Sequence, residues 1–509
     1  MVIITVIIKS GPTLTKVKFC KVSFLKLAII VIATVFMFVN YGCSVNPATG
    51  ERSFTGLLTS EDEKKIGAEE HPKLVKAFGG LYENKEIQTY VQSIGNLIKA
   101  TSEMNEMPFR FVVLDSPIIN AFALPGGYIH VTRGLLALAN DEAELAGVLA
   151  HEIAHVTARH SAQRYSRDLV VSLGTTILGA VVGSRPIAEL SNLAGSAYVQ
   201  GYSREQEFQA DMLGVRYLSR AGYDPNAMSS FLSTMGAENL LRLKIDGKDN
   251  KNNHYNLFSS HPRTADRVDR SAKQARLTNK NARIRDRNIY LRKIDGLVWG
   301  DSAKQGYIRD GNFDHPYLKI HFTAPKGFTL KNSSSTVFGT HTSGAKMQFD
   351  GAKVINKNLS TADYMRIEWL PEIQLSNIES LMINSFDAAT ATGLLTIGGT
   401  WANARFVAIR WAENYVYRFL FINPNGKTPI MDSSFRDSAY TFRKLSNSEA
   451  MKLNPMRVRI LEVKLGQGKQ ELAALMGIKS NKLEWFNVLN GFSSNTKLKV
   501  GQMVKILSR

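Results

Sequence analysis

The segment from residue 151 to residue 155 reads His-Glu-Ile-Ala-His, and its spacing constrains the fold more than any other feature of the chain. On an α-helix, residues four apart lie on one face, about one turn along the axis. His151 and His155 can therefore point two imidazoles at one metal ion. Glu152 lies roughly 100° around the helix, near the ion without having to bind it. A carboxylate in that place suits a general base that takes a proton from water held at a metal.

The residues around this segment predict that it is helical. Asp141, with Glu144 three residues later, has the spacing of a capping box at a helix start. The apolar residues that follow recur at helical spacing and would form one buried stripe: Leu145, Val148, Leu149 and Ile153. The same pattern also fits an ordinary helix whose two histidines are hydrogen-bonded at the edge of a core, so the motif alone is a hypothesis.

Length and composition indicate a globular chain of several domains. The 509 residues are enough for two to four domains, and 44% of them are hydrophobic and 21% charged. The formal charge of +19 favours contact with anionic surfaces such as lipid head groups, wall polymers or nucleic acid. Because no nucleic-acid-binding module accompanies this charge, we predict no nucleic-acid partner.

The N-terminal segment has the features of an export signal. Lysines precede a 13-residue apolar run from Leu27 to Val39, which is short for a membrane span but typical of a signal-peptide core. Gly42-Cys43 at its end resembles the bacterial lipobox, in which the cysteine is lipidated and becomes the first residue. We predict a lipoprotein signal peptide over residues 1–42, lipidation of Cys43 and a tether over residues 43–60. An uncleaved N-terminal anchor is the alternative.

The cysteine count limits the chemistry of the mature chain. Cys20 and Cys43 are the two cysteines in the sequence. Cleavage before Cys43 would leave one of them, so no intramolecular disulfide would form and no zinc ligand would be a thiolate. Stability must then come from packing.

The stretch before the His-Glu-Ile-Ala-His segment predicts two helices and a small sheet. Helices are expected from Ser60 towards Glu70 and from Ile87 to Ala100, with strands from Phe109 to Leu114 and from Tyr128 to Thr132 around a turn at residues 125–127. The strand residues Tyr128, Ile129 and His130 are candidates for an exposed sheet edge that a substrate peptide could extend. An ordinary core hairpin explains them as well.

The stretch after that segment is mainly helical. Residues 169–183 predict a buried or site-covering helix that is short for a membrane span. Helices are also expected over residues 202–220 and 226–243, followed by a polar loop over residues 244–256. Residues 263–293 are basic and helical in character, and residues 276–296 are assigned as a linker.

The second of these helices offers further ligands. Glu207 and Asp211 are four apart and share a helix face. One carboxylate can complete a His-His-Glu zinc site, and the other can accept the free N–H of a ligand histidine. A solvated acidic face is the alternative reading, and the upstream motif favours the metal site.

At this point the sequence resembles the gluzincin metallopeptidases of the CAAX-prenyl-protease/HtpX type. The resemblance covers roughly residues 60–275 and rests on Asn120-Ala121, Pro125-Gly126-Gly127, His151 to His155, Glu207 to Asp211 and Ser260-His261-Pro262. The mature part has no further membrane-length apolar segment, so the chain is similar to the exported bacterial branch of BepA-like envelope proteases. The resemblance implies one zinc ion held by His151, His155 and Glu207, with Glu152 as general base and Asp211 in support.

The resemblance also implies a role for two later residues. In BepA-like proteins, the histidine that corresponds to His261 can occupy the open zinc position and keep the enzyme latent, and Arg267 matches a basic residue near that loop. A loop histidine with a structural role is the alternative for His261. His71, His130, His160 and His315 are interpreted as structural.

The C-terminal half predicts two further units. Between residues 297 and 450, strand-like runs alternate with turns, which indicates an α+β domain, and its role is unknown. Residues 455–509 resemble a degenerate LysM module, which points to peptidoglycan as a partner. The acidic-polar turn usual after its first glycine is replaced by Gln467-Gly468-Lys469, which weakens the expectation of glycan binding.

These observations predict an α+β protein in which a mainly helical zincin-type domain with a small sheet spans residues 61–275. We expect a zinc endopeptidase of the bacterial cell envelope that faces the periplasm, lipid-anchored to the outer membrane rather than the inner one. Its substrates would be misfolded or unassembled envelope polypeptides. An envelope assembly or chaperone factor with a latent or secondary zinc site is the alternative, and a wall-anchored binding protein is a third reading.

Overall fold

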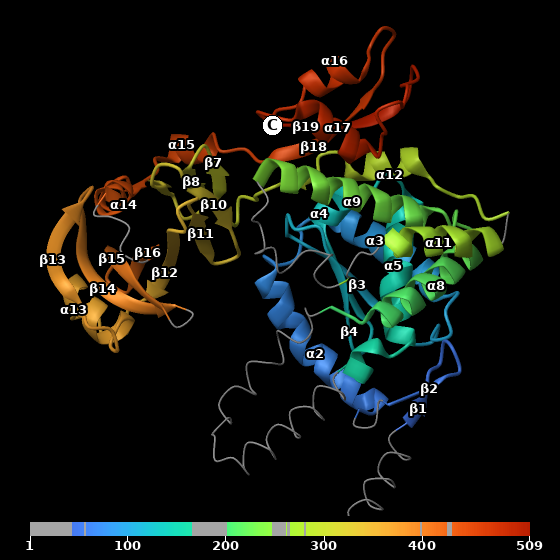
Figure 1. Ribbon diagram of the computed structural model, residues 1–509, viewed down its shortest axis with the longest axis horizontal. Helices are drawn as coiled ribbons and strands as arrows, with labels where there is room; N and C mark the ends of the chain where they lie inside the picture. The colour runs from blue at the N-terminus through green and yellow to red at the C-terminus, as the bar shows by residue number, and fades with distance from the viewer. Residues whose placement is uncertain are drawn as a thin grey trace, which may run out of the picture.

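The computed structural model describes residues 43–54, 58–164, 201–246, 261, 265–278, 281–397, 400–424 and 430–509. It confirms the α+β class: Figure 1 shows a mainly helical body beside a β-rich body, with the C-terminal residues folded back onto the helical body. The predicted signal segment (residues 1–42), the predicted helix at residues 169–183 and residues 247–256 of the predicted polar loop lie outside the described residues. Among the helices that are described, none combines the length and apolarity needed to cross a membrane.

The helical body consists of residues 43–299 and 455–509 of the described chain. It holds a hairpin, a three-stranded sheet and eight helices from the first of these ranges. These elements are β1 (Cys43–Val45), β2 (Arg52–Phe54), α2 (Ser60–Ala77), α3 (Lys85–Lys99), β3 (Arg110–Leu114), β4 (Ala121–Leu124), β5 (Tyr128–Thr132), α4 (Arg133–Leu138), α5 (Glu142–Thr157), α8 (Arg204–Arg220), α9 (Ala227–Asp246), α11 (Ala265–Leu277), α12 (Arg287–Ile294) and β6 (Val298–Trp299).

Helix α5 runs through the centre of the helical body and is buried along almost its whole length. Its N-cap is Asp141, as predicted, whose Oδ1 accepts from the Glu144 backbone N–H at 2.9 Å. The Glu144 carboxylate accepts instead from the N–H of Asn140, one residue before the cap, at 2.9 Å. In α2, Thr59 makes the capping box with Asp62, one residue before the predicted start at Ser60. The caps fix where these helices begin, and so fix the direction of the side chains on α5.

The small sheet has the strand order β3-β5-β4. Strand β5 pairs in parallel with β3 on one side and antiparallel with β4 on the other. The prediction that Tyr128, Ile129 and His130 form an exposed edge is therefore wrong, because both rows of backbone groups on β5 are bonded within the sheet. Strand β4, which follows β3 in the chain, takes the outer position next to β5.

Residues 43–54, which were expected to be part of a tether, contain the antiparallel hairpin β1–β2. The Asn46 side chain accepts the backbone N–H of Ala48 at 2.9 Å and so closes the turn locally. The Asn46 amide also donates to the carbonyl of Ala158, just past α5, at 3.3 Å. Ala48 is buried in the main core, and Arg216 on α8 donates to its carbonyl at 3.1 Å. The hairpin therefore packs against α8 and against the C-terminal end of α5.

Residues 455–509, predicted as a separate small module, share one hydrophobic core with α5. They form β18 (Met456–Glu462), α16 (Lys469–Ala474), α17 (Lys482–Asn490) and β19 (Met503–Ser508), and β18 pairs with both β19 and β6. The buried Lys505 donates to the carbonyls of Ala137, Leu138 and Ala139 at 2.7 to 3.0 Å, at the C-terminal end of α4. Helix α12, in the predicted linker, also buries Tyr290 in this core.

The β-rich body consists of residues 301–451 of the described chain and has cores of its own. Its seven-stranded sheet has the order β10-β11-β12-β16-β15-β14-β13, and a four-stranded sheet has the order β17-β9-β8-β7. The strands are β7 (Tyr307–Arg309), β8 (Asn312–His315), β9 (Ile320–Thr323), β10 (Thr329–Asn332), β11 (Thr336–Thr340), β12 (Lys346–Lys353), β13 (Ser376–Ile383), β14 (Phe386–Ile397), β15 (Thr400–Ala412), β16 (Tyr415–Pro424) and β17 (Arg443–Lys444). The helices are α13 (Thr361–Tyr364), the π-helix η1 (Met365–Trp369), α14 (Ile430–Tyr440) and α15 (Asn447–Met451).

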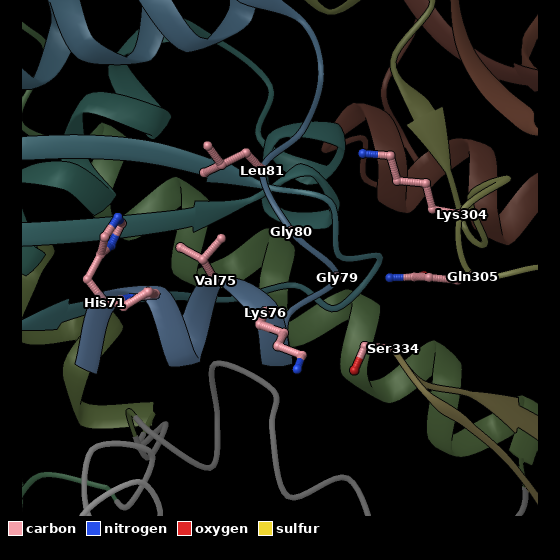
Figure 2. A pocket seen from close by; sticks show the side chains of 10 residues that line it. His71, Val75, Lys76, Gly79, Gly80, Leu81, Lys304, Gln305 and Ser334 are labelled. Atoms are coloured by element: carbon pink, nitrogen blue, oxygen red, sulfur yellow. The ribbon is translucent and has the colours of Figure 1, made fainter. Parts of the chain in front are cut away.

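The two bodies meet near the C-terminal end of α2. Figure 2 shows Lys304 and Gln305 of the β-rich body reaching towards the glycine turn after this helix. The Gln305 amide donates to the carbonyl of Asp115 at 3.0 Å, and Lys304 pairs with Glu83 at 2.7 Å. A cavity of about 530 Å³ remains at this junction, and its lining contains none of the predicted metal ligands.

Candidate metal centre

Helices α5 and α8 pack against each other and carry the predicted ligands. His151 and His155 lie one turn apart on α5, and Glu207 and Asp211 lie one turn apart on α8. Gly214 allows the close approach, because a Cβ at that position would lie 3.2 Å from the backbone nitrogen of His151. The contact between the two helices brings the carboxylates of α8 to the imidazoles of α5.

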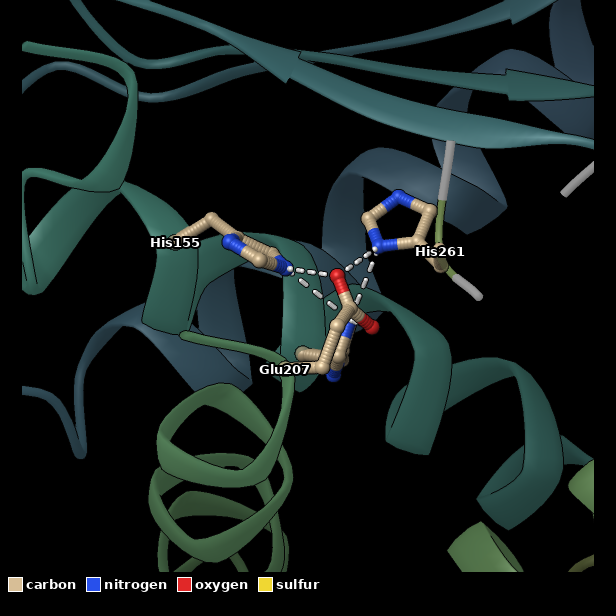
Figure 3. A group of neighbouring side chains, drawn as sticks. His155, Glu207 and His261 are labelled. Atoms are coloured by element: carbon tan, nitrogen blue, oxygen red, sulfur yellow. Dashed lines mark hydrogen bonds and ion pairs between the residues drawn. The ribbon is translucent and has the colours of Figure 1, made fainter. Parts of the chain in front are cut away.

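The four side chains of His151, His155, Glu207 and His261 bring their ligand atoms close together. Figure 3 shows His155 and His261 pointing towards the carboxylate of Glu207. The Nε2 atoms of His151 and His155 are 3.0 Å apart, and His261 Nδ1 lies 3.2 Å from His151 Nε2. His261 Nδ1 is 2.9 Å from Glu207 Oε1, which is 3.5 Å from His155 Nε2. One ligand atom from each residue lies within 4.8 Å of all the others. Each of the four side chains is buried.

This arrangement fits a metal ion better than a hydrogen-bonded cluster. Each ring nitrogen carries either a proton or a lone pair, so three nitrogens at this distance cannot all bond to one another. Imidazole nitrogen and carboxylate oxygen are the donor atoms that zinc takes in such sites. Glu152 is fully buried, and its oxygens have no hydrogen-bond partner among the described residues. His261 Nε2, at 3.4 Å, faces its Oε1 atom.

Asp211 and Arg267 hold the ligands in place. Asp211 Oδ1 lies 3.0 Å from His151 Nδ1, the ring nitrogen that faces away from the cluster. Arg267 donates from Nε and Nη2 to both Asp211 oxygens at 2.7 Å, and its Nη1 lies 2.6 Å from Glu207 Oε2. A fork of this kind orients both carboxylates at once. Arg267 thus contacts a ligand carboxylate and the carboxylate that supports a ligand histidine.

The electrostatics of the site follow from burial opposed by these contacts. Burial raises the pKa of Asp211 and of Glu207, but Arg267 outweighs it at Asp211, and His261 with Arg267 outweighs it at Glu207, so both pKa values fall below their ordinary range. Burial would lower the pKa of His151, yet its hydrogen bonds to Asp211 and Glu207 raise it to about 9. At Glu152 burial prevails over the nearby histidines and raises the pKa.

Two residues that sequence reasoning did not place in the site lie against His155. His160, interpreted as structural, has Nδ1 at 2.9 Å from His155 Nδ1. The ring of Tyr202 stacks on His155 with 3.8 Å between centroids. A histidine five residues after a ligand has no simple helical relation to it, so spacing gave no signal for His160. The other histidines interpreted as structural lie outside the cluster: His71 bonds to His130 at 2.9 Å, and His315 bonds to the Lys304 carbonyl at 3.0 Å.

The helix pair, the buried ligand set and the adjacent Glu152 define a zinc metallopeptidase domain of the His-Glu-x-x-His class. Residues 83–274 match peptidase family M48, and this range contains every residue of the centre described above. The similarity to this family is therefore carried by that part of the chain.

Three relatives are similar to this chain over part of their length. The chain is 30% identical over 230 residues to a putative beta-barrel assembly-enhancing protease of Vibrio cholerae, over 43% of this chain and 46% of the relative. It is 35% identical over 157 residues to the beta-barrel assembly-enhancing protease of Escherichia coli, over 29% and 32% of the two chains. It is 31% identical over 194 residues to the mitochondrial metalloendopeptidase OMA1 of Schizosaccharomyces pombe, over 38% and 57%. The matches thus leave 43% to 68% of each relative uncovered.

Proposed function

We propose that this protein is a zinc-dependent endopeptidase of the bacterial cell envelope, acting on misfolded or unassembled envelope polypeptides. The observation that carries the proposal is the convergence of three ring nitrogens and one carboxylate beside the buried Glu152. The names of the two bacterial relatives, which describe proteases that enhance β-barrel assembly, support the envelope setting and the substrate class. Lipid attachment at Cys43 and contact with peptidoglycan through residues 455–509 remain part of the proposal from sequence.

The chain's own residues divide the work of hydrolysis. Zinc, when bound, supplies a Lewis acid that polarises the substrate carbonyl and lowers the pKa of water. Glu152 accepts the proton of the attacking water and returns it to the nitrogen of the leaving amine. His151, His155 and Glu207 hold the ion, while Asp211 and Arg267 fix the orientation of His151 and Glu207. With β5 in the middle of its sheet, any added substrate strand would have to pair at one of the two edges, made by β3 and β4.

His261 favours a second candidate function. It completes a set of four protein ligands, and an ion held by all four would have no open position of the kind that catalytic zinc sites keep. We propose that this contact holds the peptidase latent. If the peptidase were latent at all times, the protein would act as an envelope assembly or chaperone factor whose zinc site is secondary.

Metal analysis combined with a cleavage assay tests the proposed function. We expect about one zinc per wild-type chain and cleavage of an unfolded polypeptide, with Glu152→Gln retaining the zinc and losing about 10²–10⁴-fold in rate. A wild-type chain that binds no zinc, or a Glu152→Gln variant that cleaves at the wild-type rate, would contradict it. If Glu152→Gln also restored every phenotype of a strain without the protein, the assembly-factor reading would replace the protease.

A further inference from the structure

The contact between His155 and His160 depends on an unusual turn. Helix α5 ends at Thr157, and Arg159 then takes a left-handed backbone conformation with φ of 55°. A non-glycine residue in this region is disfavoured and persists where its surroundings hold it. Arg159 donates to Glu63 Oε1 at 2.9 and 3.0 Å and to the carbonyl of Leu58 at 2.8 Å. This anchored turn directs the next residue, His160, back towards His155.

A series of hydrogen bonds leads from His155 through His160 and Gln209 to Glu51, and in each of them the donor and the acceptor can be assigned. Glu51, in the turn of the β1–β2 hairpin, accepts from the amide nitrogen of Gln209 at 3.2 Å. A carboxylate accepts but does not donate, so the amide oxygen of Gln209 faces the other way, towards His160 Nε2 at 2.8 Å. His160 Nε2 must therefore carry the proton of that bond.

The remaining assignments follow from His160. In a neutral imidazole with a proton on Nε2, the Nδ1 atom is an acceptor. His160 Nδ1 faces His155 Nδ1 at 2.9 Å, so His155 must donate, which places its proton on Nδ1. Its Nε2 atom then presents a lone pair to the ligand cluster, as a metal ligand must. Both histidines are fully buried, so no solvent competes for these bonds.

We infer that His160 is a positioning residue, which fixes the tautomer and ring orientation of His155 for the metal. The two ligand histidines then have different supports: a carboxylate, Asp211, for His151, and a neutral imidazole, relayed through Gln209, for His155. The inference rests on the proposed zinc site. It gives the N-terminal hairpin a part in that site, since Glu51 fixes the orientation of Gln209.

Three substitutions at one position test the inference through zinc affinity, measured on the full chain by competition with a chelator. His160→Leu removes the acceptor, and we expect a 10- to 100-fold loss of affinity. His160→Asn places its Oδ1 atom where Nδ1 lies and should stay within a few-fold of wild type. His160→Gln places its amide near the position of Nε2 instead and should resemble His160→Leu. Thermal unfolding of the metal-free variants separates these effects from loss of folding.

His315→Leu is the matched control, because it also removes a buried histidine with both ring nitrogens hydrogen-bonded, in the β-rich body. It should leave zinc affinity unchanged. Wild-type affinity in His160→Leu would overturn the inference, and so would equal losses in His160→Leu and His160→Asn, which would indicate packing alone. A wild-type chain without zinc would overturn the proposed function as well. The KM for a polypeptide substrate should not change in any variant, because His160 lies behind His155 rather than against the substrate.

Discussion

The helical body and the β-rich body bury different kinds of side chain. In the helical body, Glu152, His155, Glu207, Asp211 and Arg267 are each at most 3% exposed. The larger core of the β-rich body is rich in aromatic side chains, with the rings of Phe349 and Phe419 4.7 Å apart and Phe322 and Phe442 beside them. Burying charge costs free energy unless the groups are paired or bind a metal, whereas burying aromatic rings is favourable in itself. The buried charged groups of the helical body are thus explained by the metal centre that they form. The aromatic core of the β-rich body is explained by its contribution to the stability of that body.

Of the four substitutions, Glu207→Ala should have the largest effect. It should lower zinc affinity in the helical body and leave the β-rich body unchanged. It removes a ligand and leaves Arg267 with one carboxylate instead of two. Zinc affinity should fall by more than about 100-fold, since losing even a residue that only supports a ligand costs 10- to 100-fold. Competition with a chelator measures this loss. Glu205→Ala, at an exposed position on the same helix, is the control, and full zinc occupancy in Glu207→Ala would remove Glu207 from the ligand set.

Phe419→Ala should destabilise the β-rich body and leave the metal centre of the helical body unchanged. It leaves a cavity in the aromatic core and should lower the free energy of unfolding of the β-rich body by about 3–5 kcal/mol. Zinc affinity should not change. Urea denaturation with a probe in each body measures the effect, and Phe338→Ala, at a position that is 46% exposed in the same sheet, serves as the control. A parallel loss of zinc would show that the two bodies are not independent in this respect.

His261→Ala tests the latent state within the helical body. If the four-ligand arrangement is populated ~99% of the time, removing the fourth ligand can raise cleavage up to ~100-fold. We expect faster initial cleavage of an unfolded substrate, or self-degradation, when rates are compared at equal zinc occupancy. A variant that cleaves more slowly than wild type would contradict the proposal that His261 holds the peptidase latent. It would leave His261 with a structural role or a direct role in catalysis.

Lys505→Met should have the smallest effect of the four, and it tests where the helical body ends. The substitution keeps the length of the side chain but removes the donor to three carbonyls at the end of α4. We expect a loss of about 1–3 kcal/mol in the unfolding of the helical body, with Lys499→Met, at an exposed position, as control. If residues 455–509 melted separately from the metal centre, they would be an independent module after all.

The ligands on α5 and α8 could be predicted because their geometry is local. Helical periodicity alone brings His151 to His155 and Glu207 to Asp211. His261 entered through family resemblance alone, since its distance from the helices along the chain carries no information on contact. His160 was not recognised because its position depends on the left-handed turn at Arg159, which is stabilised by Glu63 from a distant helix.

The errors in the fold prediction also concern non-local contacts. The alternation of strand residues predicts that residues 128–132 form a strand, and they do, but it does not predict strand order. The turn residues 46–50 indicated an irregular tether, yet Asn46 and Ala48 are buried against segments more than 100 residues away. The core shared by α5 and residues 455–509 could not be predicted either, because it also depends on contacts between distant segments.

The donation from Lys505 to α4 spans up to 368 residues of sequence, and this separation has a consequence for folding. Contacts between distant segments form late, because the loop between them must be closed first. During synthesis, domains generally fold from the N-terminal end, but this core includes strand β19, which follows the β-rich body in the sequence. We therefore expect the ligand helices to remain incompletely packed until residues 455–509 have been made, which delays completion of the peptidase until the β-rich body between its two parts has also been synthesised.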